Sequence, residues 1–171
     1  MKLAGPGFTD EQMKILAESL GRMRQKDCTD FINRTLAKHK VDAKFDSVDK
    51  LFRQATFGRY ELPSRFGADT GYTEADLGVD SHSLIMLRDD FVNRGATAVT
   101  VGTRVFLSDR AFTRNDSYLN RDVADTPSII VHELFHVARI DKRIVDSQQL
   151  TNEIREHCRK PGYSNPIILK H

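Results

Sequence analysis

The chain has 171 residues, of which 39% are hydrophobic and 29% charged, and its formal net charge at pH 7 is +2. This composition excludes a disordered chain, and the length is typical of a single globular domain with a sizeable core. The near balance of acidic and basic residues argues against a nucleic-acid or membrane-surface protein, and no apolar stretch approaches the roughly 20 residues that span a bilayer. We therefore expect one domain over residues 1–171, with no nucleic-acid or membrane partner.

The first part of the chain, residues 1–95, is predicted to be mainly helical. Thr9 and Gln12 have the spacing of a capping box, and apolar residues follow at helical intervals. A stretch rich in Gly, Asp and Thr then predicts a long loop. Further expected elements are helices over 27–38 and 47–56, the loop over 58–80, and either a helix or a buried strand over 84–92.

The second part combines strands with two helices. Residues 96–107 are rich in β-branched and aromatic side chains and predict strands around Gly102, and residues 109–125 are polar and predicted to be irregular. Thr126 is predicted to cap a helix with Pro127 in its first position. This helix should end near Arg139, and a last helix, capped by Asp146 or Ser147, should run to Cys158. The predicted fold class is α+β, mostly helical, with a small sheet packed on the helix that starts at Thr126.

The two cysteines, Cys28 and Cys158, lie near opposite ends of the chain. They have no metal-binding spacing, so they are either two buried thiols or one disulfide. A bridge would join the early helices to the last helix and would indicate an oxidising compartment, which makes a secreted or periplasmic protein the predicted location. The first seven residues lack an apolar segment, and we expect no signal peptide within this sequence.

The most informative motif is H-E-x-x-H, formed by His132, Glu133 and His136 inside the helix predicted from Thr126. Side chains four residues apart lie on one helical face, so both imidazoles can bind one Zn²⁺ ion. A catalytic zinc site takes three protein ligands and a water. Glu133 is rotated away from the histidines and can accept a proton from that water as the general base. The predicted site therefore consists of His132 and His136 as zinc ligands and Glu133 as the catalytic general base.

The segment from His132 to His136 resembles the zinc helix of the zincin metallopeptidases. Residues 97–101 and 105–107 resemble the edge strand that precedes this helix, and the resemblance covers about residues 96–158. It implies a zinc-dependent peptidase with a peptide or protein as substrate, bound along the edge strand. Residues 1–95 resemble no named family.

The third zinc ligand is less clear from the sequence. The metzincin pattern is excluded, because Arg139 and Lys142 stand where that family has its Gly and third His, and the aspzincin motif is absent. A gluzincin-like arrangement, which takes a Glu from the next helix, favours Glu153 in an Asn-Glu pair. Helical phase also favours Glu153, because it places this residue at the border of the inward face. Asp141, Glu156, Asp146 and His157 remain candidates for the same role.

The predicted function is hydrolysis of peptide bonds by a metal-activated water, with Glu133 as general base. Two further functions remain open from the sequence. One is a toxin-like protease effector that cuts a single host or rival protein. The second is a metal-binding interaction module without catalysis, in which Glu133 would be dispensable.

Overall fold

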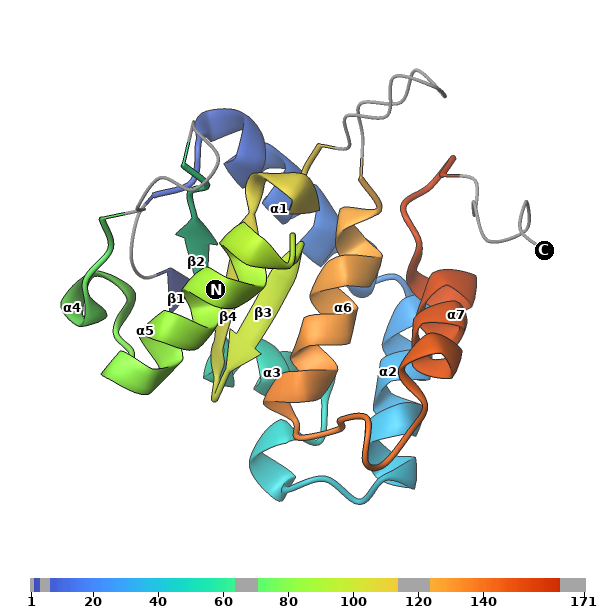
Figure 1. Ribbon diagram of the computed structural model, residues 1–171. Helices are drawn as coiled ribbons and strands as arrows, with labels where there is room; N and C mark the ends of the chain where they lie inside the picture. Colours follow the sequence, from blue (N-terminus) through green and yellow to red (C-terminus); the bar gives the residue numbers. More distant parts are fainter. Residues whose placement is uncertain (1, 4–6, 64–70, 114–123, 164–171) are drawn as a thin grey trace.

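A computed structural model describes residues 2–3, 7–63, 71–113 and 124–163 (Figure 1). It confirms the α+β fold class, with mostly helical secondary structure and one small mixed sheet. Parts of the predicted loop over 58–80 and of the predicted irregular segment over 109–125 lie outside the described residues. The helices are α1 (Asp10–Met23), α2 (Lys26–Lys38), α3 (Val48–Gln54), α4 (Glu74–Leu77), α5 (Ser81–Arg88), α6 (Thr126–Val137) and α7 (Ser147–Cys158), and the strands are β1 (Lys2–Leu3), β2 (Thr56–Tyr60), β3 (Ala98–Val101) and β4 (Arg104–Ser108).

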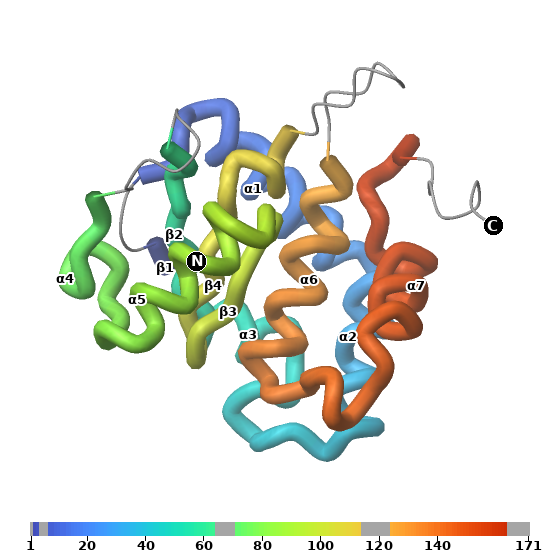
Figure 2. The backbone as a smooth tube through the Cα atoms, in the orientation of Figure 1, coloured from blue at the N-terminus to red at the C-terminus, as the bar shows by residue number. Residues whose placement is uncertain are grey.

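The sheet has the strand order β1-β2-β4-β3. Strands β1, β2 and β4 are parallel neighbours, whereas β3 and β4 form an antiparallel hairpin around Gly102, whose φ is 62°. This hairpin agrees with the strands predicted over 96–107. It also leaves β3 at the edge of the sheet, where it packs beside α6 (Figure 2). Within the described ranges, the strand next to the motif helix therefore has one unpaired edge.

Strand β2 was not predicted, and its position corrects two expectations. The helix expected over 47–56 ends at Gln54, and the loop expected from residue 58 starts with a strand that continues to Tyr60. The strand pairs with β4 from Thr56↔Arg104 to Tyr60↔Ser108, partners almost 50 residues apart. A five-residue segment with a central glycine has little tendency of its own to form a strand. The segment is extended because it pairs with the distant β4.

The sheet separates two apolar clusters, and the side chains of β4 alternate between them. Val105 and Leu107 belong to the main core, which includes buried residues of α1, α2, α3, α6 and α7. Phe106 points to the other face and packs with Tyr60 and Phe91 under the α4 and α5 region. The motif helix α6 is thus held in the larger layer, between the edge of the sheet and α7 (Figure 1).

Local capping agrees with the sequence in one helix and differs in another. Thr9 and Gln12 form the predicted capping box of α1. At α6, Asp125 rather than Thr126 occupies the N-cap position, and Thr126 is the first helical residue. Its hydroxyl donates instead to the carbonyl oxygen of Ala111 at 2.7 Å, a contact made 15 residues away in sequence. The undecided segment over 84–92 is helical, consisting of the end of α5 and a π-helical turn over Asp89–Asn93.

Cys28 and Cys158 form a disulfide, with Cα atoms 4.7 Å apart and a sequence separation of 130. The bridge joins α2 to the end of α7, which decides between the two states that the sequence left open. Arg22 strengthens the same junction, because its guanidinium donates to the carbonyl oxygens of His157 and Arg159, each at 2.8 Å. In the part of the chain that the structure describes, no helix is both long and apolar enough to cross a membrane.

Candidate metal centre

His132 and His136 lie on one face of α6, as their spacing predicts. Their Nε2 atoms are 3.1 Å apart, and both rings are partly buried. Two nitrogens that each lie 2.0–2.1 Å from a tetrahedral zinc ion are themselves about 3.3 Å apart. The pair of Nε2 atoms therefore has nearly the separation that a shared ion requires.

The orientation of His136 is fixed from behind by the residue where the chain leaves the helix. Its Nδ1 lies 3.0 Å from the carbonyl oxygen of Ile140. A carbonyl oxygen only accepts hydrogen bonds, so Nδ1 carries the proton and Nε2 keeps its lone pair in the neutral ring. Metal-binding histidines in proteins use the same arrangement to hold the ring and its tautomer. Nε2 of His136 thus has the lone pair that a metal ligand needs.

Glu133 is 6% exposed and points toward the edge strand. The hydroxyl of Thr100, on β3, lies 3.0 Å from Oε2 of Glu133 and 3.3 Å from its backbone oxygen. Thr100 was not identified from the sequence, because its partner is 33 residues away and only the hairpin brings it to α6. The carboxylate of the predicted general base is therefore held by a hydrogen bond from the strand beside it.

Burial shifts the ionisation of all three motif residues. It lowers the pKa of His132 to about 4, with the charge of His136 adding to the effect. It also lowers the pKa of His136, against the opposing effects of the Ile140 carbonyl and Asp141. For Glu133, burial raises the pKa to about 7, and the hydrogen bond from Thr100 opposes the rise. With their pKa values lowered, the imidazoles are uncharged at neutral pH, as metal ligands must be, whereas the raised pKa of Glu133 favours the protonated form of its carboxyl group.

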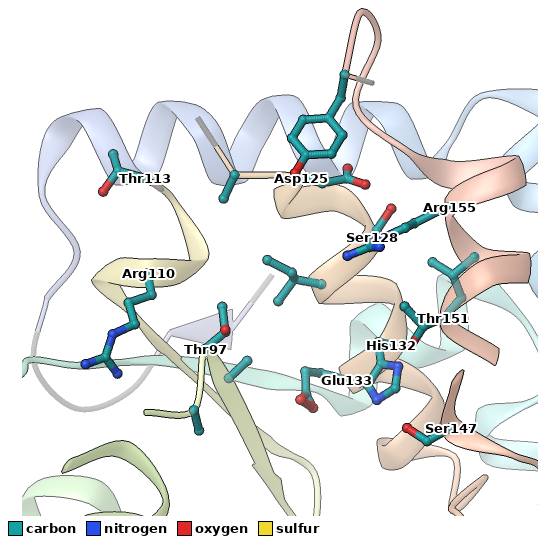
Figure 3. Close-up of a pocket in the computed structure, with 16 residues that line it drawn as sticks. Thr97, Arg110, Thr113, Asp125, Ser128, His132, Glu133, Ser147, Thr151 and Arg155 are labelled. Carbon is teal, nitrogen blue, oxygen red and sulfur yellow. The ribbon is translucent and has the colours of Figure 1, made fainter. Parts of the chain in front are cut away.

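Two open cavities meet at Glu133. The first has a volume of about 670 Å³ and extends along α6 from His132 toward Asp125, between the sheet and α7 (Figure 3). The second, of about 560 Å³, continues past Thr100 and His136 on the other side. Ala98, on the edge strand, lines both. Both cavities border β3 and the motif helix, and we call the two together the motif cleft.

Glu153 does not join the two histidines. It is partly buried on α7, where one of its carboxylate oxygens accepts from Nε2 of Gln149 at 3.2 Å. His157, one turn later on the same side, stacks on Phe31 of α2 with ring centroids 4.7 Å apart. The side of α7 that lines the first cavity carries other residues, namely Ser147, Thr151, Ile154 and Arg155. Helical phase located the inward face of α7, but Glu153 lies at the border facing α2 and not at the border facing α6.

Among the acidic candidates, Asp141 is the one that shares a cavity with both histidines. This third cavity, of about 320 Å³, is lined by His132, His136 and Asp141, among others. The carboxylate of Asp141 is paired with the guanidinium of Arg143 at 2.9 Å. The remaining candidate ligands are engaged or turned elsewhere: Asp146 caps α7, Glu156 is exposed and His157 stacks on Phe31. In the described ranges, no three His, Cys, Asp or Glu side chains form a ready-made metal-binding group.

Comparison with known proteins finds no matching family model, no similar curated protein and no similar solved structure. The chemistry of this site therefore has to be inferred from its own residues.

Proposed function

We propose that this protein is a zinc-dependent peptidase whose active site is the cleft around His132, Glu133 and His136. The observation that carries the proposal is the 3.1 Å separation of the two Nε2 atoms, with the tautomer of His136 set by the Ile140 carbonyl. A buried carboxylate lies one residue away, beside an unpaired strand edge. Two oriented imidazoles fit a zinc ion, and the edge of β3 fits an extended peptide.

A bound zinc ion would supply a water of lowered pKa and would polarise the substrate carbonyl. Glu133 would take the proton of the attacking water and pass it to the leaving amine. Thr100 would hold the carboxylate in position through its hydroxyl. The unpaired edge of β3 would align the backbone of the substrate by strand pairing, so that the scissile bond lies opposite Glu133.

We propose Asp141 as the third protein ligand in place of Glu153. Asp141 follows the zinc helix directly and lines the cavity that both histidines share. Its carboxylate would exchange Arg143 for the metal, and its side chain is 32% exposed, so it has room to turn. Glu153, in contrast, is on the α2 side of α7.

Zinc content tests both proposals on the purified, dialysed chain. We expect about one zinc per chain, loss of zinc in His132→Ala and His136→Ala, and weaker retention in Asp141→Asn. Glu153→Gln is the matched control and should keep the metal. Full zinc retention in Asp141→Asn together with loss in Glu153→Gln would reverse the assignment of the third ligand. A chain that takes up no zinc in the presence of excess metal would refute the site itself.

Cleavage of a fluorogenic peptide library then tests the reaction. Glu133→Gln should keep the zinc and lose at least a hundredfold in activity, because general-base catalysis contributes on the order of 10²–10⁴-fold. Unchanged activity in this variant would contradict the mechanism.

A second candidate is a metal-binding module without turnover. It is favoured by the lack of a ready-made three-ligand group among the described residues. It predicts zinc binding with no cleavage of any library peptide by the wild-type chain.

The disulfide supports an oxidising compartment as the place of action, and we propose a secreted or periplasmic protein. Detection of the bridged form in non-reduced protein from its native source would test this.

A further inference from the structure

The first cavity of the cleft holds a set of polar groups that the proposed catalytic residues do not use. Ser128 lies four residues before His132 on the same face of α6, so it is one helical turn, about 6 Å along the axis, from the proposed metal ligand. It is 6% exposed, and its hydroxyl has no hydrogen-bond partner among the described residues. A buried hydroxyl without a partner is costly, and one that lines a cavity is available to a ligand.

A cation faces the same part of the cavity from the opposite wall. Arg155, on α7, is partly buried and lines the cavity, and its guanidinium forms no ion pair with a described carboxylate. Figure 3 shows its side chain extending from α7 toward the side of α6 on which Ser128 lies. A partly desolvated guanidinium presents a planar fork of donors that suits a carboxylate.

Asp125 limits where an anion can bind. It lies near the start of α6, at the far end of the cavity, and is 4% exposed. Its Oδ1 accepts from the backbone N–H of Lys160 at 2.8 Å, and its Oδ2 has no hydrogen-bond partner in the part of the chain that the structure describes. This negative charge opposes a carboxylate at the end of the cavity and favours one near Ser128 and Arg155, closer to His132.

We propose that Ser128 and Arg155 form a carboxylate-binding subsite, which selects peptides with a negative charge one or two residues from the scissile bond. The proposal rests on the proposed peptidase function and names its substrate class. The carboxylate comes either from an acidic side chain or from the C-terminus of a short peptide. In both cases Arg155 pairs with it and the hydroxyl of Ser128 donates to it.

Peptide capture tests the proposal without cleavage. Immobilised Glu133→Gln protein is incubated with a degenerate peptide library in four matched forms, with Glu or Gln at one fixed position and a free or amidated C-terminus. Retained peptides are quantified by mass spectrometry, once with zinc and once after chelation, because zinc itself attracts carboxylates. We expect a roughly ten- to hundredfold preference for the carboxylate forms, as the loss of a charge-assisted hydrogen bond implies.

Variants in the Glu133→Gln background then assign the preference. Arg155→Gln should abolish it, Ser128→Ala should weaken it, and Arg155→Lys should keep part of it. Arg34→Gln, an exposed arginine on α2 away from the cleft, is the matched control and should change nothing. Zinc content and melting temperature are measured for each variant, so that a misfolded protein is recognised.

The outcomes separate the two carboxylate sources and the two proposals. Preference for the free C-terminus identifies a terminal carboxylate, and preference for internal Glu identifies a side chain; either supports the subsite if it depends on Arg155 after chelation. The subsite is refuted by any of three results: equal retention of acidic and neutral peptides, a preference for basic peptides, or a preference for acidic peptides that is unchanged in Arg155→Gln. A chain that binds no zinc but selects carboxylates through Arg155 would refute the metallopeptidase and leave the subsite in place.

Discussion

Replacement of Glu133 by Gln should stabilise the metal-free protein at neutral and higher pH. Burial raises the pKa of this carboxyl group to about 7 in the folded chain, from an ordinary value of 4.5. Below pH 4.5 the group is protonated in both states and has no effect on stability. Between pH 4.5 and 7 the unfolded chain loses the proton more readily, so stability falls, and above pH 7 the loss is complete. Gln is uncharged at every pH and removes this cost.

The size of the effect follows from the same two pKa values. Their difference corresponds to about 3 kcal/mol of unfolding free energy above pH 7. The buried amide of Gln has donors that Thr100 cannot fully satisfy, which reduces the expected gain to about 1–3 kcal/mol. For a domain of this size the gain raises the melting temperature by roughly 3–10 °C.

The difference in stability is measured by thermal unfolding of the EDTA-treated wild type and Glu133→Gln. Unfolding is followed by circular dichroism from about pH 4 to about pH 8.5. Near pH 4 the variant should be no more stable than the wild type, and up to about 2 kcal/mol less stable, and the difference should shift progressively in favour of the variant up to about pH 8. Glu156→Gln, an exposed carboxylate on α7, serves as the control and should follow the wild type throughout. If Glu133→Gln is no more stable than the wild type at the alkaline end of this range, the carboxylate is not the desolvated group that the structure describes.

Three further predictions concern the framework around the site. Reduction of the Cys28–Cys158 bridge, which closes a loop with a sequence separation of 130, should lower the free energy of unfolding by up to about 5 kcal/mol. Denaturant unfolding with and without reductant measures this loss, and an unchanged midpoint would contradict the prediction. Thr9→Ala removes the capping box of α1 and should cost about 1 kcal/mol in the same assay, whereas Thr9→Ser should not. Gly78→Ala should cost about 1–2 kcal/mol, because φ is 68° there and a Cβ atom would meet the guanidinium of Arg104 at 2.8 Å; a neutral result would show that this turn relaxes.

The sequence by itself determined the α+β class, the helix that carries the motif and the presence of both histidines on one of its faces. These properties depend on local spacing: an i, i+4 pair lies on one side of any helix, and a capping box acts within four residues. The hairpin around Gly102 was predictable for the same reason. The two cysteines were left open between thiols and a bridge, because nothing local fixes the distance between residues 28 and 158.

Only the tertiary structure decided which groups surround the motif. Strand β2 exists because β4 pairs with it, and Thr100 reaches Glu133 because the hairpin places β3 beside α6. Helical phase favoured Glu153 as a ligand. Phase, however, defines only which face of α7 is buried, and it does not say which neighbouring helix packs against each side of that face. Here the border with Glu153 meets α2, and the opposite border, with Arg155, meets the cleft. The packing angle between two helices depends on side chains far apart in sequence, and the sequence of one helix does not contain it.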